Sequence, residues 1–409
     1  MNILFISTSD LHGGAAIAAF RLMNALPAEE MNVNMLVRDK RSSNGNVIEV
    51  GNKTINEWNF LWERGKIFMA NRFSRKNLFD ISIANTGVPV TELPEFQYAD
   101  IIHLHWINQG MLSVKEIGRI LASGKKVVWT MHDMWPFTGI CHHAENCTNY
   151  HRECGRCPYL VAPSRHDLSN KIFKQKQTTY SLGKITFVAC SNWLKDLAEK
   201  SPLTTAHTPV SIPNPIDTQH YRPIDKIGTR KKLQLPLDKK IVLFAAVKTS
   251  DKRKGSDYLI EASRLMKQHT DNVLFLIAGN NGKEIANQLA LPTQSMGFVA
   301  PENMPDVYNA ADVFVTPSLQ ENLPNTIMEA MACGTPCVGF CIGGIPEMID
   351  HLKTGYVAKY KNSTDLAKGL FWTLFEADTE TLSANAREKV VKTYAQEIVS
   401  AQYKQIYAR

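Results

Sequence analysis

The sequence has 409 residues, of which 44% are hydrophobic and 21% are charged; this composition is typical of a folded globular protein and excludes a disordered chain. The length exceeds what one hydrophobic core normally supports, so we expect two domains of roughly 200 residues each. The net charge of +7 suits anionic partners such as nucleotides or acidic lipids, but it is too small to indicate nucleic-acid binding by itself.

We looked in the sequence for the patterns of a transmembrane helix and of a secretory signal. No apolar run approaches the ~20 residues of a transmembrane helix. The residues after Met1 show neither the basic segment nor the small-residue cleavage site of a secretory signal. We therefore expect a cytoplasmic protein.

Short apolar runs alternate with helical patterns along nearly the whole chain. Most runs are continuous, as expected of parallel strands that are covered on both faces. Helical patterns at 15–26, 257–268 and 325–332 lie between them. The pattern predicts an α/β fold with two doubly wound halves. Its expected strands are 2–6, 33–37, 101–104, 127–130 and 185–189 in the first half, and 241–247, 273–278, 313–316 and 336–340 in the second.

Two adjacent glycines, Gly13 and Gly14, stand where the first expected strand turns into the first expected helix. Glycine lets the backbone approach a ligand, and the N–H groups at a helix start favour anions. The turn lacks the G-x-G-x-x-G pattern, which argues against a dinucleotide-dependent dehydrogenase. Gly13 and Gly14 thus indicate either a ligand-facing turn or a turn that needs glycine only for its dihedral angles.

Aromatic and basic residues are interleaved between Trp58 and Phe79, where Glu63 is the one acid. This mixture suits an amphipathic helix on an anionic membrane. It also suits a helix that buries its aromatic side in the core and exposes a solvated basic face. The cations are Arg64, Lys66, Arg72, Arg75 and Lys76.

Four cysteines cluster at Cys141, Cys147, Cys154 and Cys157 and supply the ligand count of a tetrahedral structural zinc site. In a reducing compartment such clustering favours a metal over disulfides. Reduced buried thiols or a disulfide are the alternatives. A catalytic zinc is not expected, because four thiolates leave no open position. Alternative ligands nearby are His142, His143 and His151.

The stretch 201–226 contains five prolines and no helical period, so it predicts the seam between the halves. We expect a first domain at 1–210 with a Cys-rich insert at 141–157, a second domain at 211–392, and a final helical segment at 393–409.

Two loops of the second half carry charge directly after expected strands. The first holds Lys248, Lys252, Arg253 and Lys254, which either bind phosphate or form a solvated basic loop. The second holds Glu321 and leads into a helix that carries Glu329. Carboxylates can bind sugar hydroxyls and the free N–H groups of a helix start can bind phosphate, at the strand ends where such sheets bind ligands. The alternative is a solvated helix start. The residues that would offer these amides are Asn322, Leu323, Asn325 and Thr326.

The pair Glu321 and Glu329, with seven residues between them and Ala-Met-Ala-Cys-Gly-Thr-Pro after, resembles the E-x7-E signature of family 4 retaining glycosyltransferases with the GT-B fold. The resemblance covers essentially the whole chain. Its other motifs, in family order, are 13–14, 212–217, 254–255, 343–347 and 354–356. The segment around 132–157 also resembles a subgroup with a Cys-rich insert. The resemblance implies two Rossmann-like domains that face an interdomain cleft, with the last helix crossing back to the first domain.

The resemblance also implies roles for single residues. Glu321 and His132 would contact the donor sugar, and Glu329 the ribose hydroxyls. Lys254 would neutralise the donor diphosphate. Lys248 stands where the family has an arginine, and lysine lacks the bidentate fork of that residue, so Lys252 or Arg253 are alternatives for this role.

The expected activity is that of a retaining glycosyltransferase, of the hexosyltransferase type (EC 2.4). It moves a sugar from a nucleotide diphosphate-sugar to a glycan or lipid-linked acceptor, in cell-surface polysaccharide or lipopolysaccharide assembly at the inner face of the cell membrane. No D-x-D motif ends an expected strand, so catalysis requires no metal or other cofactor; a structural zinc is the one cofactor considered. The alternatives are a non-catalytic sugar-nucleotide-binding relative, an epimerase or phosphorylase of similar fold, and a zinc-bearing nucleic-acid-binding protein. The last leaves Glu321 and Glu329 unexplained, so nucleic acid is not an expected partner.

Overall fold

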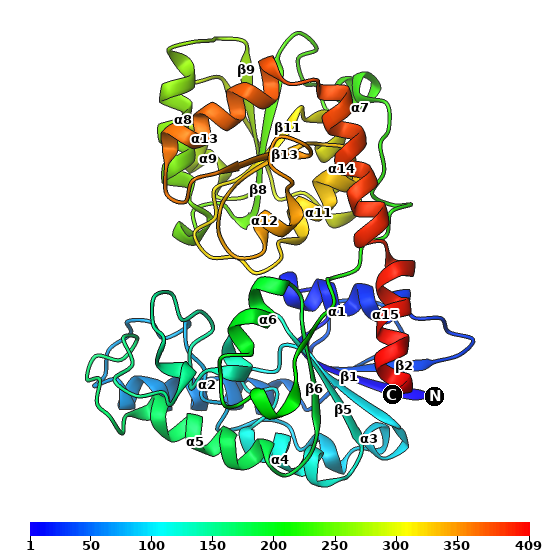
Figure 1. Cartoon of the computed structure of the whole chain (residues 1–409), viewed down its shortest axis with the longest axis vertical. Helices are drawn as coiled ribbons and strands as arrows, with labels where there is room; N and C mark the ends of the chain where they lie inside the picture. The colour runs from blue at the N-terminus through cyan, green and yellow to red at the C-terminus, as the bar shows by residue number, and fades with distance from the viewer. The chain divides into compact units, whose positions relative to one another are not determined.

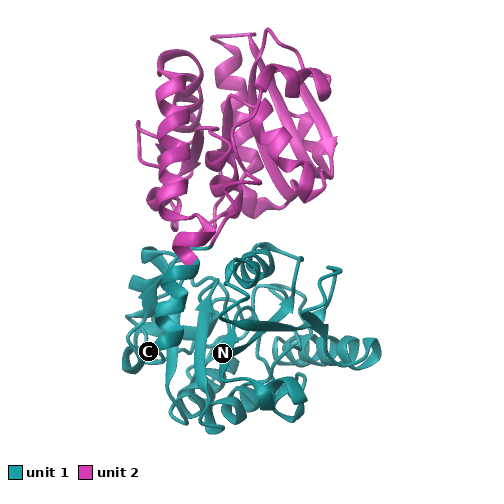
Figure 2. Cartoon of the chain, turned by 90° about the vertical axis from the view of Figure 1, so that its right-hand side faces the viewer, with its two compact units in different colours: residues 1–214, 400–409 teal, residues 215–399 magenta.

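The computed structural model describes all 409 residues, and the chain divides into two compact units (Figure 2). Unit 1 comprises residues 1–214 and 400–409, and unit 2 comprises residues 215–399. Each unit is built on one sheet whose strands all run parallel (Figure 1). The prediction of two doubly wound α/β halves is therefore confirmed.

The sheet of unit 1 has seven strands in the order β3-β2-β1-β4-β5-β6-β7. Its central strands are continuous apolar runs because helices cover both faces, and β1 is buried along all but its first residue. The order reverses between β1 and β4, which makes this edge a topological switch point. The strands are β1 (Asn2–Ser9), β2 (Asn32–Asp39), β3 (Val47–Glu49), β4 (Ile101–Leu104), β5 (Lys126–Met131), β6 (Ile185–Ala189) and β7 (Val210–Ser211).

The last helix of the chain, α15 (Gln396–Ala408), contributes its final residues to unit 1. There the Tyr407 hydroxyl lies 2.7 Å from Nδ1 of His103, and the Tyr403 hydroxyl lies 2.8 Å from the Thr130 hydroxyl. The other helices of this unit are α1 (Gly14–Ala25), α2 (Lys53–Ala70), α3 (Pro94–Tyr98), α4 (Val114–Ala122), α5 (Leu168–Tyr180) and α6 (Asn192–Ala198).

The sheet of unit 2 has six strands in the order β10-β9-β8-β11-β12-β13, which reverses between β8 and β11. Open parallel sheets bind ligands outside the carboxyl ends of the strands at such a point. The strands are β8 (Lys240–Lys248), β9 (Val273–Asn280), β10 (Thr293–Gly297), β11 (Val313–Thr316), β12 (Cys337–Phe340) and β13 (Gly355–Ala358).

The helices of unit 2 cover this sheet. On it, α8 (Ser256–Lys267) packs beside α13 (Ser363–Phe371), and α11 (Asn325–Ala332) packs against α14 (Thr379–Thr393) (Figure 1). No helix in either unit combines the length and the apolarity that a membrane span requires. The remaining helices are α7 (Lys226–Lys232), α9 (Gly282–Ala286), α10 (Met304–Ala310) and α12 (Ile345–Met348).

Candidate functional site

The loops that follow β8 and β11 touch through their backbones at the switch point of unit 2. Gly255 has a φ of +70°, and a Cβ atom there would lie 1.8 Å from the carbonyl oxygen of Pro317. The Leu319 N–H donates to the Arg253 carbonyl oxygen at 2.8 Å. Only glycine allows this approach, which brings the basic loop against the loop of Glu321.

The loop after β12 closes on the Glu321 loop from the other side. Gly343 has a φ of +57°, and a Cβ atom there would lie 1.8 Å from the Glu321 carbonyl oxygen. The Gly344 N–H donates to the Asn322 carbonyl oxygen at 2.7 Å. Three loops, each at the carboxyl end of a strand, therefore fix the position of Glu321.

Lys254 and Glu321 form an ion pair at this point. The Lys254 ammonium lies 2.5 Å from Oε1 of Glu321, and the two side chains are 36% and 14% exposed. The structure thus brings together two of the predicted site residues, and their partial exposure leaves the pair accessible to a ligand. An anionic ligand would take hydrogen bonds from the same ammonium group.

The other cations of the basic loop differ in their availability. Arg253 is ion-paired with Asp251 at 2.7 Å, within its own loop, so it is engaged there rather than presented as a substitute for the family's arginine. Lys248 ends β8 in register with Asn280, and both Lys248 and Lys252 are exposed.

Glu329 lies on the second turn of α11 and is 8% exposed. Its Oε2 accepts a hydrogen bond from the Tyr308 hydroxyl at 2.7 Å. Burial, together with the charge of Glu329, raises the pKa of Tyr308 far above its ordinary value, so this hydroxyl remains a donor. The sequence pattern did not identify Tyr308, because the contact depends on how α10 and α11 pack.

The first turn of α11 has no side-chain cap. Pro324 occupies the N-cap and offers no side-chain acceptor to the N–H groups of the first turn. Asn322 and Leu323 are buried in the preceding loop, while Asn325 and Thr326 are half-buried in the first turn. The predicted phosphate-binding amides therefore follow the Glu321 loop directly.

The remaining predicted residues of the donor site, Gly13, Gly14 and His132, belong to unit 1. Gly13 has a φ of +93°, and a Cβ atom there would meet no heavy atom within 4 Å. The positive φ therefore explains why residue 13 is a glycine. The exposed turn before α1, like the start of α11, has no side-chain cap.

His132 takes part in a short chain of polar groups at the carboxyl edge of the unit 1 sheet. Its Nε2 lies 3.2 Å from Nδ1 of His105, and its Nδ1 lies 3.4 Å from Sγ of Cys190. Burial lowers the pKa of His132 to about 4 and that of His105 well below its ordinary value. At neutral pH His132 is therefore an uncharged hydrogen-bonding group. The sequence pattern did not single out His105 or Cys190, although His103 and His105 are two residues apart and therefore share one face at the end of a strand.

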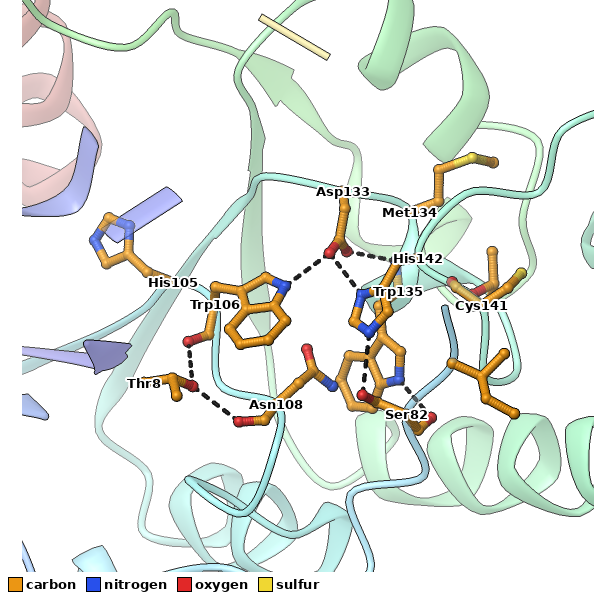
Figure 3. A network of polar contacts seen from close by, with 12 residues as sticks. Thr8, Ser82, His105, Trp106, Asn108, Asp133, Met134, Trp135, Cys141 and His142 are labelled. Atoms are coloured by element: carbon orange, nitrogen blue, oxygen red, sulfur yellow. Dashed lines mark hydrogen bonds and ion pairs between the residues drawn. The ribbon is translucent and has the colours of Figure 1, made fainter. Parts of the chain in front are cut away.

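A second polar network joins the segments that follow β4 and β5 to Ser82 (Figure 3). Asp133 Oδ2 accepts hydrogen bonds from Trp106 Nε1 at 2.8 Å and from His142 Nδ1 at 2.7 Å, and His142 Nε2 lies 3.0 Å from Ser82 Oγ. Burial acts to raise the pKa of Asp133, but His142 holds it at about 2. This Ser-His-Asp chain is not a hydrolytic site, because Ser82 is fully buried and its Oγ also accepts from Arg64.

The four clustered cysteines line one pocket. Cys141, Cys154 and Cys157 are buried, Cys147 is half-buried, and all are free thiols. Burial raises the pKa of Cys154 to about 12 and that of Cys157 to about 11, so without a metal they remain protonated. The structure arranges no three His, Cys, Asp or Glu side chains around a point that could hold an ion, and the zinc site stays a prediction.

Residues 225–389, which lie within unit 2, match the family described as "Glycosyl transferases group 1". Over 81% of its length the chain is 27% identical to an uncharacterized glycosyltransferase of Methanocaldococcus jannaschii, of which the match covers 90%. It is 30% identical over 44% of its length to the amylovoran biosynthesis glycosyltransferase AmsK of Erwinia amylovora, of which the match covers 47%.

Solved structures of glycosyltransferases show the same fold along the whole chain. A sucrose-phosphate synthase of Thermosynechococcus elongatus aligns with a TM-score of 0.67 at 18% identity, over 100% of this chain and 98% of that one. Anabaena HepE in complex with UDP and glucose aligns with a TM-score of 0.65 at 18% identity, over 100% of this chain and 99% of that one. The two-domain GT-B architecture is thus the fold of this protein.

Proposed function

We propose that this chain, whose second unit matches the group 1 glycosyltransferase family, is a retaining glycosyltransferase that moves a hexose from a nucleoside diphosphate-sugar to an acceptor hydroxyl. The observation that carries the proposal is the ion pair of Lys254 with Glu321 at the switch point of unit 2. It lies inside the residues that match the family. The complex of HepE with UDP and glucose supports a nucleotide-sugar as donor.

The chemistry follows from the charges that develop when the anomeric C–O bond breaks. The sugar becomes positive and the departing diphosphate becomes more negative. The Lys254 ammonium and the N–H groups at the start of α11 stabilise the diphosphate, and this electrostatic stabilisation is commonly the largest contribution to catalysis. Glu321 hydrogen-bonds the sugar hydroxyls, and the acceptor attacks from the face that the diphosphate leaves, which retains the configuration.

Two further residues orient the donor in this proposal. Glu329 binds the ribose hydroxyls, and its bond to Tyr308 fixes the direction of the carboxylate. The family resemblance assigns His132 to the donor sugar, and its pKa of about 4 leaves the imidazole neutral at neutral pH. Such a weak base is a poor acceptor for the proton of the attacking hydroxyl, which passes to the leaving phosphate instead.

We further propose that the acceptor is a glycan or a lipid-linked sugar of cell-surface polysaccharide or lipopolysaccharide assembly. The relative named for amylovoran biosynthesis supports this setting. A chain that binds a nucleotide-sugar without turning it over would instead be a non-catalytic relative.

The test begins with a thermal-shift screen of nucleotide-sugars, followed by calorimetry of the nucleoside diphosphate that binds. Lys254→Ala should weaken diphosphate affinity by roughly 10- to 150-fold, since hydrogen bonds to charged groups contribute about 1.5–3 kcal/mol. Lys252→Ala is the matched control, because Lys252 is an exposed cation of the same loop. Glu321→Gln should keep nucleotide binding and lose turnover. Equal affinity of Lys254→Ala and wild type would refute the phosphate assignment.

A further inference from the structure

Helix α2 of unit 1 buries its polar side and exposes its apolar side. The residues that it buries are Asn56, Asn59, Glu63, Arg64 and Ile67. Trp58 and Leu61 are 63% and 62% exposed, and Ile55, Trp62 and Met69 are also exposed. A helix on the surface of a globular protein normally does the opposite. Of the two alternatives that the sequence left open, the helix that buries its aromatic side in the core is therefore wrong for Trp58 and Trp62.

The buried polar side chains fix the helix in this orientation. Glu63 Oε1 accepts the N–H groups of Ile83 and Ala84 at 2.7 and 2.9 Å. Arg64 Nη1 donates to the Ile81 carbonyl oxygen at 3.0 Å, and Arg64 Nη2 pairs with Glu63 at 2.9 Å. Turning the tryptophans inward would leave these charges and backbone groups without partners, which is strongly unfavourable.

The exposed apolar surface continues past the end of α2. Trp58 and Trp62 stack with ring centroids 5.8 Å apart, and the Lys66 ammonium lies 4.7 Å from the Trp62 ring. Beyond the helix, Phe73 is 71% exposed and Phe79 is 63% exposed. Exposed large apolar side chains that gather on one short segment indicate an interaction site, whereas scattered ones do not.

The charge around this surface selects the partner. The exposed charged residues of 53–79 include a single acid, Glu57, because Glu63 is buried and paired with Arg64. A second copy of the same positively charged face would be repelled, whereas anionic headgroups would be attracted. Tryptophan side chains are also enriched at the boundary between headgroups and acyl chains. The exposed cations are Lys53, Lys66, Arg72, Arg75 and Lys76.

We propose that residues 53–79 form a docking surface for an anionic lipid bilayer. The exposed face of α2 lies in the plane of the interface, with Trp58, Leu61 and Trp62 inserted below the headgroups. Lys66 and the cations of 72–76 contact the lipid phosphates. This inference uses no residue of the nucleotide-sugar site and stands apart from the proposed activity.

The test is co-sedimentation of the full chain with vesicles of phosphatidylcholine alone and of an equal mixture of phosphatidylcholine and phosphatidylglycerol. Wild-type protein should bind the anionic vesicles, bind less as salt is raised, and show a blue shift of tryptophan fluorescence. The variant K66Q/R72Q/K76Q should bind roughly a hundredfold more weakly, at about fivefold for each charge. Its matched control, K231Q/K283Q/K353Q, removes three exposed lysines of unit 2 and should lose less.

The apolar half of the proposal is tested by W58Q/L61Q/W62Q, with I227Q/L237Q as control, because Ile227 and Leu237 are exposed in unit 2. The first variant should lose vesicle binding and the fluorescence shift, while its melting temperature and its nucleotide affinity stay those of wild type. Three outcomes would overturn the proposal: no binding of wild type to anionic vesicles, equal binding of W58Q/L61Q/W62Q, or a dimer that this variant dissociates without any vesicle binding.

Discussion

Replacing Gly343 with alanine tests whether the loop contacts of unit 2 position Glu321. The new methyl carbon would lie 1.8 Å from the Glu321 carbonyl oxygen, at a φ of +57°. The left-handed backbone costs about 1 kcal/mol and the collision adds about 1–3 kcal/mol. A total near 3 kcal/mol corresponds to a fall of roughly 6–12 °C in melting temperature for a domain of this size.

The collision should also displace the Glu321 loop, since the carbonyl oxygen is fixed to the same residue as the carboxylate. A misplacement of about 1 Å can reduce turnover by roughly a hundredfold. Differential scanning calorimetry measures the fall in melting temperature. An assay of donor turnover, once the screen has identified the nucleotide-sugar, measures the loss of activity.

Two glycines of unit 1 provide the controls. Gly124→Ala adds backbone strain at φ +75° with no atom within 4 Å, and should cost only roughly 2–4 °C. Gly45→Ala has open space and no positive φ, and should leave the melting temperature unchanged. If Gly343→Ala falls no further than Gly124→Ala, the proposed role of the loop contact is refuted.

Two other predictions concern unit 1. Acid should destabilise it as the pH falls below about 6.5 towards 4, because burial keeps His103, His105 and His132 neutral in the folded state while the unfolded chain takes up their protons. Each histidine should contribute about 1.4 kcal/mol per pH unit to the free energy of unfolding, measured by urea denaturation at several pH values; a flat profile would contradict this. The Cys-rich pocket should bind one zinc ion per chain, as measured by elemental analysis. The variant Cys154→Ser should lose this zinc, whereas the control Cys341→Ser, at an exposed cysteine, should keep it. Metal-free wild-type protein would count against the site.

The sequence pattern located every interior strand of both sheets and missed each of the four edge strands. The interior strands are buried on two faces and read as continuous apolar runs, as β1 and β8 do. The edge strands β3, β7, β10 and β13 contain two to five residues each, and β10 (Thr293–Gly297) has no buried residue. Their pairing is set by the strand beside them, which a local pattern cannot reveal.

The site was predictable as far as it depends on position along the chain. Glu321 and Lys254 each follow a buried strand, so the shared edge of a parallel sheet explains why they lie together. The contacts of Tyr308 with Glu329 and of His105 with His132 depend on helix packing and strand register. The orientation of α2 could likewise not be predicted, because it depends on the hydrogen bonds that Glu63 accepts from the N–H groups of residues 83 and 84, outside its own helix.

The closing turns of α15 have a consequence for synthesis in the cell. Unit 2 is one uninterrupted stretch, 215–399, and can fold as soon as it leaves the ribosome. Unit 1 begins first but also needs residues 400–409, which follow unit 2 in the sequence and supply Tyr403 and Tyr407 to Thr130 and His103. A chain truncated before Tyr403 would therefore keep every residue of unit 2, while His103 and Thr130 of unit 1 would lose the two tyrosine hydroxyls that contact them.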